Sequence, residues 1–272
     1  MDIDPQPTTT DLLEAMLRRD RWVLAGALIV ILALAWGWLV AGAGMEMSAL
    51  EMTRMAGMDG WLMRPAVWTP SYAALIATMW SVMMVAMMLP SAAPMLLFFA
   101  RIHRRSAAAR MPALPTALFA AGYLLAWGGF SIAATALQWG LESLRLLSPM
   151  LETSNRWLGA GILVGAGVWQ LTPLKARCLS ECRSPLGFLT GHWRAGAVGA
   201  LRMGLVHGAY CLGCCWFLMA LLFFGGVMNL YWIVGLAAFV LIEKIVPAGQ
   251  TVARAVGVVL IVWGVALLAP GW

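Results

Sequence analysis

Long, uninterrupted apolar runs dominate this sequence and limit what it can fold into. The 272 residues are 62% hydrophobic and only 11% charged, and the mean hydropathy is +0.84. Soluble domains are about 25% charged, and a water-soluble core cannot bury so much apolar surface. In lipid, only helices and closed barrels satisfy their backbone hydrogen bonds, and the runs here lack strand-like alternation. We therefore predict an all-α, polytopic membrane helix bundle.

The lengths of the runs predict about seven transmembrane helices. A hydrocarbon core about 30 Å thick needs about 20 apolar residues per helix. The predicted spans are residues 22–43, 71–99, 113–138, 157–174, 197–223, 230–248 and 252–269. The first run is too long for the apolar part of a signal peptide, so we expect it to remain as a span. Residues 22–272 then form a single transmembrane domain, with a long outer loop at 43–70.

The positions of the basic residues predict the orientation of the chain. If the loops alternate between the two sides, one side carries fourteen basic residues: Arg18, Arg19, Arg21, Arg101, Arg104, Arg105, Arg110, Lys175, Arg177, Arg183, Arg194, Arg202, Lys244 and Arg254. The other side carries four: Arg54, Arg64, Arg145 and Arg156. Basic residues concentrate on the cytoplasmic side, so segment 1–21 is predicted to be cytoplasmic. The formal charge of +6 is thus a topology signal, and nothing indicates a nucleic-acid partner.

The fifth predicted span carries a stripe of possible metal ligands. They follow one another at steps of four, and these residues are Met203, His207, Cys211, Cys215 and Met219, with Cys214 beside them. Residues four apart lie on the same side of a helix, but each step over-rotates by about 40°. The stripe therefore winds around the helix, and its five members cannot share one site.

The residue types of this stripe favour Cu(I). Thiolate, thioether and imidazole groups are soft ligands that select Cu(I) over harder cations. The alternative is that the cysteines and methionines are apolar packing residues. Three cysteines and a histidine within one span favour metal or thiol chemistry, because polar groups inside a membrane are costly.

The second predicted span carries a two-sided methionine stripe. Met79, Met83 and Met87 are spaced by four, Met84 and Met88 are offset by one, and Pro90 and Pro94 follow. Proline disrupts the helical hydrogen bonds, so we expect a kink there. By analogy, the spacing resembles the thioether rings of eukaryotic copper-uptake channels, although packing alone also explains it.

Two further pairs could carry chemistry. Cys178 and Cys182 lie on a predicted cytoplasmic loop, where free thiols or a metal site are favoured over a disulfide. Glu243 and Lys244 end the sixth predicted span and point about 100° apart on a helix, so they cannot both face solvent by default. Glu243 is a candidate partner for His207, and the pair could equally mark the membrane interface.

Glycine spacing predicts where helices approach closely. Gly204 and Gly208, and Gly161 and Gly165, repeat the small-x-x-x-small pattern of packed membrane helices. No phosphate-binding loop, carboxylate dyad or Ser/His/Asp arrangement is visible, so the chain is not expected to be an enzyme.

Several strings resemble a known family. They are Tyr210 to Trp216 (YCLGCCW), Met83 to Ser91, Pro173 to Cys182, Met228 to Leu230, and Glu243-Lys244. Together they resemble the bacterial predicted metal-binding integral membrane proteins, a family of unknown function, over about residues 70–250. The motif positions carried over are Met83, Met84, Met87, Met88, Cys178, Cys182, Cys211, Cys214, Cys215, Glu243 and Lys244. The resemblance implies a bacterial inner-membrane protein that handles copper for delivery to copper oxidases.

These observations predict a multi-pass membrane protein that binds Cu(I), either as a transporter or as a membrane chaperone. The outer loop, with Met45, Met47, Met52, Met55 and Met58, would collect or release the ion. Expected partners are the lipid bilayer, a copper chaperone or copper-dependent oxidase, and a second copy of the chain. The rival functions are a transmembrane thiol-disulfide electron carrier and a scaffold subunit of a membrane complex.

Overall fold

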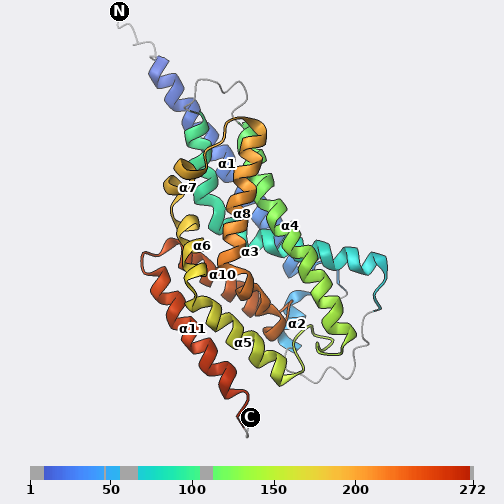
Figure 1. Cartoon of the computed structure of the whole chain (residues 1–272). Coiled ribbons are helices and arrows are strands. Elements are labelled where there is room, and N and C mark those ends of the chain that lie inside the picture. Colours follow the sequence, from blue (N-terminus) through green and yellow to red (C-terminus); the bar gives the residue numbers. More distant parts are fainter. Residues whose placement is uncertain (1–8, 46, 56–66, 105–112, 270–272) are drawn as a thin grey trace, which may run out of the picture.

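The chain is all-helical in the part that the structure describes. The computed structural model describes residues 9–45, 47–55, 67–104 and 113–269. It is 83% helix, with no strand within these ranges. The helices are α1 (Thr9–Val40), α2 (Ala49–Met55), α3 (Pro70–Arg104), α4 (Ala113–Ser143), α5 (Arg156–Leu171), α6 (Pro173–Arg183), α7 (Pro185–His192), α8 (Gly196–Ala220), α9 (Leu222–Gly225), α10 (Leu230–Ile245) and α11 (Gly249–Ala266) (Figure 1).

Five of these helices are long and apolar enough to cross a membrane. They cover Trp22–Val40, Pro70–His103, Leu114–Ser143, Gly196–Gly225 and Gly249–Ala266, and the bent pair α5 and α6 makes up to six. The sixth predicted span, 230–248, corresponds to α10, which has only 16 residues, so seven spans are not confirmed. Apolar side chains of α1 and α11, such as Leu34 and Val262, point outward, as expected of surfaces facing lipid.

The centre of the molecule is formed by α3, α4 and α8. Among their largest fully buried side chains are Trp80, Tyr123 and Trp127. The start of α1 and the end of α11 lie at opposite ends of the molecule (Figure 1). The two halves of α3 run in different directions in the same view, consistent with the kink predicted at Pro90 and Pro94.

Glycines bring α4 and α8 into backbone contact. A Cβ atom added at Gly204 would overlap the carbonyl oxygen of Phe119, and one added at Gly208 would lie 2.6 Å from the Cβ of Ala126. This confirms the predicted close approach. The second predicted pair is only half right, because Gly165 abuts Phe217 but a Cβ at Gly161 would meet nothing within 4 Å.

The two glycines give a matched pair of variants. We expect Gly204→Ala to lower the free energy of unfolding by about 1–3 kcal/mol or more, because two helix backbones must separate. Gly161→Ala should change it by less than about 0.5 kcal/mol, since the new methyl group has open space. Unfolding in mixed detergent micelles measures both values, and equal losses would contradict the α4–α8 contact.

A sharp break between α5 and α6 returns the chain to the bundle. The axes differ by 65° at Thr172, whose hydroxyl accepts a hydrogen bond from the Lys175 amide at 3.2 Å. Pro173 occupies the first turn of α6, where its missing N–H costs nothing. α6 then packs on α8. Cys178 and Cys182, which were predicted to lie on a loop, therefore lie on a packed helix.

The methionine-rich segment packs on the core where it is described. Met52 is buried, and Met45, Met47 and Met55 are partly buried against the central cluster. Ser48 and Glu51 cap α2 reciprocally, with the Ser48 amide donating to the carboxylate at 2.9 Å, and these hydrogen bonds lower the pKa of Glu51. Glu46, Met58 and Asp59 lie outside the described residues.

Candidate metal centre

Three cysteine sulfurs are buried together on one side of α8. Cys211, Cys214 and Cys215 are each at most 1% exposed. The thiols of Cys214 and Cys215 donate to the carbonyl oxygen of Cys211 at 3.0 and 2.9 Å. These bonds satisfy the two thiols locally, within the turn of α8 that carries them.

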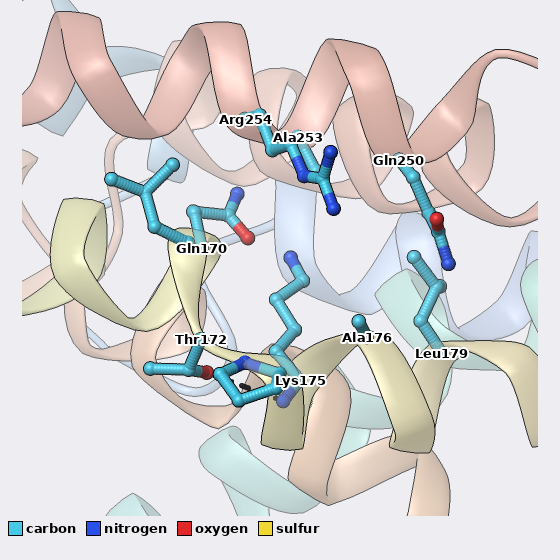
Figure 2. A pocket seen from close by; sticks show the side chains of 10 residues that line it. Gln170, Thr172, Lys175, Ala176, Leu179, Gln250, Ala253 and Arg254 are labelled. Carbon is cyan, nitrogen blue, oxygen red and sulfur yellow. Dashed lines mark hydrogen bonds between the residues drawn. The ribbon is translucent and has the colours of Figure 1, made fainter.

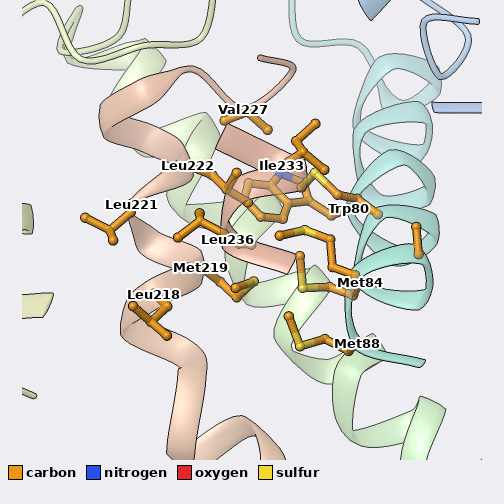
Figure 3. Close-up of a cluster of buried hydrophobic side chains, with 14 of the residues drawn as sticks. Trp80, Met84, Met88, Leu218, Met219, Leu221, Leu222, Val227, Ile233 and Leu236 are labelled. Atoms are coloured by element: carbon orange, nitrogen blue, oxygen red, sulfur yellow. The ribbon is translucent and has the colours of Figure 1, made fainter. Parts of the chain in front are cut away.

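Methionine sulfur from α3 completes one side of this group. The Cys215 sulfur lies 3.8 Å from the Met88 sulfur, although 127 residues separate the two in sequence. Met84 and Met88 point from α3 toward α8, where Met219 faces them (Figure 3). The methionine stripe and the cysteine cluster lie on two predicted spans far apart in sequence, and the fold brings them into contact, as we expect if the stripe passes the ion to the cluster.

Cys182 brings a further thiol from α6. It packs against the core cluster that contains Cys211 and Cys214. Cys178 lies one turn earlier, and a Cβ added at Gly213 would come within 2.8 Å of its sulfur. All five cysteines are free thiols. The two α6 cysteines are only partly buried, so they connect the buried group with the protein surface.

Lys244 and Tyr123 both contact the sulfur of Cys211. The Lys244 ammonium donates to this sulfur at 2.9 Å and to the Ser91 hydroxyl at 2.9 Å. The Tyr123 hydroxyl lies 3.1 Å from the same sulfur and donates to the Met88 carbonyl oxygen at 3.2 Å. A buried ammonium compensates the charge of a thiolate, which is the form of cysteine that binds metals.

Glu243 does not pair with His207, which corrects that candidate. Its carboxylate forms a fully buried ion pair with Lys175 of α6, while the neighbouring Lys244 turns toward Cys211. The different directions follow from the 100° between consecutive helical residues. Both side chains are buried inside the protein. Arg183 ties the end of α10 to α6, donating to the carbonyl oxygens of Glu243, Val246 and Pro247 at 3.0, 2.7 and 2.9 Å.

His207 lies one turn away, in an aromatic cage. Its ring centroid is 5.1 to 6.0 Å from those of Phe188, Tyr123 and Phe119. Its Nδ1 atom is buried, with no hydrogen-bond partner in the described part of the chain. Met203, one turn earlier again, belongs to a separate cluster. The stripe therefore divides between two regions, as its winding predicted.

Met83 and Met87 are buried in the same core cluster as Met84 and the α8 cysteines. Met87 also lines an apolar cavity with Trp36, Pro90 and Leu241, between α1, α3 and α10.

Tyr123 and Ser91 were missed by the sequence reasoning. Tyr123 is a lone phenol inside an apolar run of α4, and an intramembrane polar group is a candidate by default. Ser91 belongs to the string that ends the methionine stripe, but nothing in the sequence pairs it with Lys244.

In the described part of the chain, the sulfur atoms are not arranged as a closed metal site. Within the described ranges, no three His, Cys, Asp or Glu side chains are placed to close around one metal ion. Cys214 and Cys215 point their thiols at a backbone oxygen, so rotation about their Cα–Cβ bonds must precede metal binding. Soft sulfur donors, with Met88 among them, nevertheless match the chemistry of Cu(I).

The fold and site define an all-helical protein, in the ranges described, with five or six helices able to span a membrane and a buried, sulfur-rich centre next to a lysine. Residues 77–267 match the model of the PpoB2 family, described as a copper chaperone, and the chain belongs to this family. No curated protein and no solved structure matches the chain. The suspected copper-delivery family is thereby confirmed, and a chaperone role is not an enzymatic activity.

Proposed function

We propose that the protein is a membrane-embedded Cu(I) chaperone that holds its cargo at a sulfur site formed by Cys211, Cys215, Cys182 and Met88. One observation carries this proposal: sulfur atoms from α3, α6 and α8 meet in a buried place where an ammonium group already touches a cysteine sulfur. Cu(I) is the cation that such a soft donor set favours.

Displacement of Lys244 is part of the proposed loading step. Its ammonium occupies the side of Cys211 that an incoming cation would need. When Cu(I) arrives, its charge replaces that of the ammonium beside the sulfur, and Lys244 retains its contact with Ser91. A second cysteine thiol releases its proton when it binds Cu(I), and this balances the added charge, which favours loading in a low-dielectric interior.

The methionine residues supply a path to this site. Met84 and Met219 lie in the same core cluster as Met88, and Met52 of α2 belongs to it too. We propose that the ion enters from the side of the methionine-rich segment and leaves through Cys182 and Cys178. The acceptor is a further copper chaperone or a copper-dependent oxidase of a bacterial inner membrane.

A second function is favoured by one contact. Cys182 of α6 packs against the core cluster that contains Cys211 and Cys214 of α8, and this favours thiol-disulfide exchange between the two helices. A carrier of this kind would show a reversible disulfide.

Metal content decides between these functions. The full-length protein is purified in detergent under reducing conditions, beside the Cys211/Cys214/Cys215→Ser triple variant, and copper and free thiols are counted. Near-stoichiometric copper in the wild type and its loss in the variant support the chaperone. A metal-free wild type whose five thiols decrease reversibly on mild oxidation supports the carrier. A scaffold would show neither property.

A further inference from the structure

A polar cavity opens at the break between α5 and α6, where the start of α11 covers it. It has a volume of about 120 Å³ and is lined by side chains that include Gln170, Thr172, Lys175, Gln250 and Arg254. Figure 2 shows the amide of Gln170 and the ammonium of Lys175 pointing into the same space, with Arg254 above them. Neither Gln170 nor Arg254 belongs to the proposed copper site.

Among these residues, Gln170 gives the strongest indication that the cavity binds a ligand. It is 4% exposed, and neither its amide nitrogen nor its amide oxygen has a hydrogen-bond partner among the described residues. A buried amide without partners is costly, and native proteins pair such groups with protein, water or a ligand. The cavity is therefore where a partner for Gln170 has to bind.

The charges around the cavity favour an anion. The Lys175 ammonium has the Glu243 carboxylate as its partner, which makes this pair neutral overall. Arg254 is exposed at the rim and forms no ion pair with any residue in the described ranges. The remaining charge is positive. A guanidinium group, a buried ammonium and an amide N–H match the oxygen atoms of a phosphate group.

We propose that this cavity binds a phosphate group, and that an anionic phospholipid headgroup supplies it. The cavity lies beside outward-pointing apolar residues of α5 and α11, such as Val168, Leu171 and Val258, which would contact acyl chains. The basic residues Lys175 and Arg254 line it, and basic pockets between membrane helices bind anionic headgroups. Free phosphate shares the headgroup chemistry and is the other source.

A thermal-unfolding titration of the detergent-purified full chain tests the proposal. The probes are a short-chain phosphatidylglycerol, a short-chain phosphatidylcholine and inorganic phosphate, each added to wild type, Gln170→Leu, Arg254→Gln and Arg177→Gln. Arg177 is an exposed basic residue of α6 that does not line the cavity, so it is the matched control. Ligand binding to the folded state raises Tm, and the shift grows with the logarithm of the ligand concentration once it exceeds Kd.

We expect phosphatidylglycerol to raise the Tm of wild type and Arg177→Gln by about 3 °C or more. Gln170→Leu and Arg254→Gln should each need about tenfold more lipid for the same shift, since each lacks one phosphate contact. An equal shift with inorganic phosphate would assign the site to free phosphate. Shifts that are absent, or identical in all four proteins, would overturn the proposal and leave the cavity to water. Copper content of the variants stays unchanged in every case, so this test is independent of the chaperone function.

Discussion

Lys175→Met is expected to lower the free energy of unfolding by about 3–5 kcal/mol, because it leaves the Glu243 carboxylate buried without its partner. Both side chains of this ion pair are 1% exposed, and the carboxylate oxygens of Glu243 have no other hydrogen-bond donor in the described part of the chain. The pair joins α6 to α10 and so holds both helices against α8. Unfolding in mixed micelles, followed by tryptophan fluorescence, measures the loss.

A double variant distinguishes between two causes of this lower stability, the loss of the ion pair and a general disruption of packing. Lys175→Met/Glu243→Leu removes both charges and should recover most of the stability, since apolar replacement of a whole buried pair is often neutral. Arg177→Met, on an exposed position of the same helix, should change the free energy by less than about 0.5 kcal/mol. A double variant as unstable as the single variant would show that the ion pair is not the reason.

Cys211→Ser is expected to lower the affinity for Cu(I) by more than about 100-fold. Lys244 of α10 and Tyr123 of α4 both contact the sulfur of Cys211, and Cys182 of α6 packs against the same cluster. Removing a hydrogen-bonded neighbour of a metal ligand typically costs about 10–100-fold in affinity, so losing the ligand itself costs more. Competition against a chromogenic Cu(I) chelator measures the affinity.

Two variants calibrate this loss. Tyr123→Phe removes only the hydroxyl beside Cys211 and should cost about tenfold. Cys178→Ser removes a partly buried cysteine of α6 and should leave the affinity within about threefold, although it slows transfer to an acceptor. If Cys178→Ser weakens binding as much as Cys211→Ser does, the site is centred on α6 instead of α8.

The long helices that are able to cross a membrane could be predicted, because a long apolar run by itself indicates such a helix. The predicted runs at 71–99, 113–138 and 197–223 correspond to α3, α4 and α8. The errors lie where that signal is weak. α10 has only 16 residues, and α6 is polar enough to resemble a loop, although its Thr172 cap and Pro173 start are typical of a helix N-terminus.

The ligand types of the site could be predicted, but its assembly could not. Periodicity placed Cys211, Cys215 and Met219 on one side of a helix and correctly excluded a single five-membered site. Contacts across helices have no local signature. Met88 lies 127 residues from Cys215, and Lys244 lies 33 residues from Cys211. The winding of one stripe could not indicate which neighbouring helices face it.

X-ray absorption at the copper edge of the loaded, reduced protein tests the central claim most directly. We predict the absorption edge of Cu(I) and a first coordination shell made of sulfur alone. Its sulfur atoms come from Cys211, Cys215, Cys182 and Met88. In Cys211→Ser the sulfur shell should lose amplitude or copper should be absent. A shell dominated by nitrogen or oxygen in the wild type, or an unchanged sulfur shell in Cys211→Ser, would contradict the claim that this buried sulfur group holds the cargo.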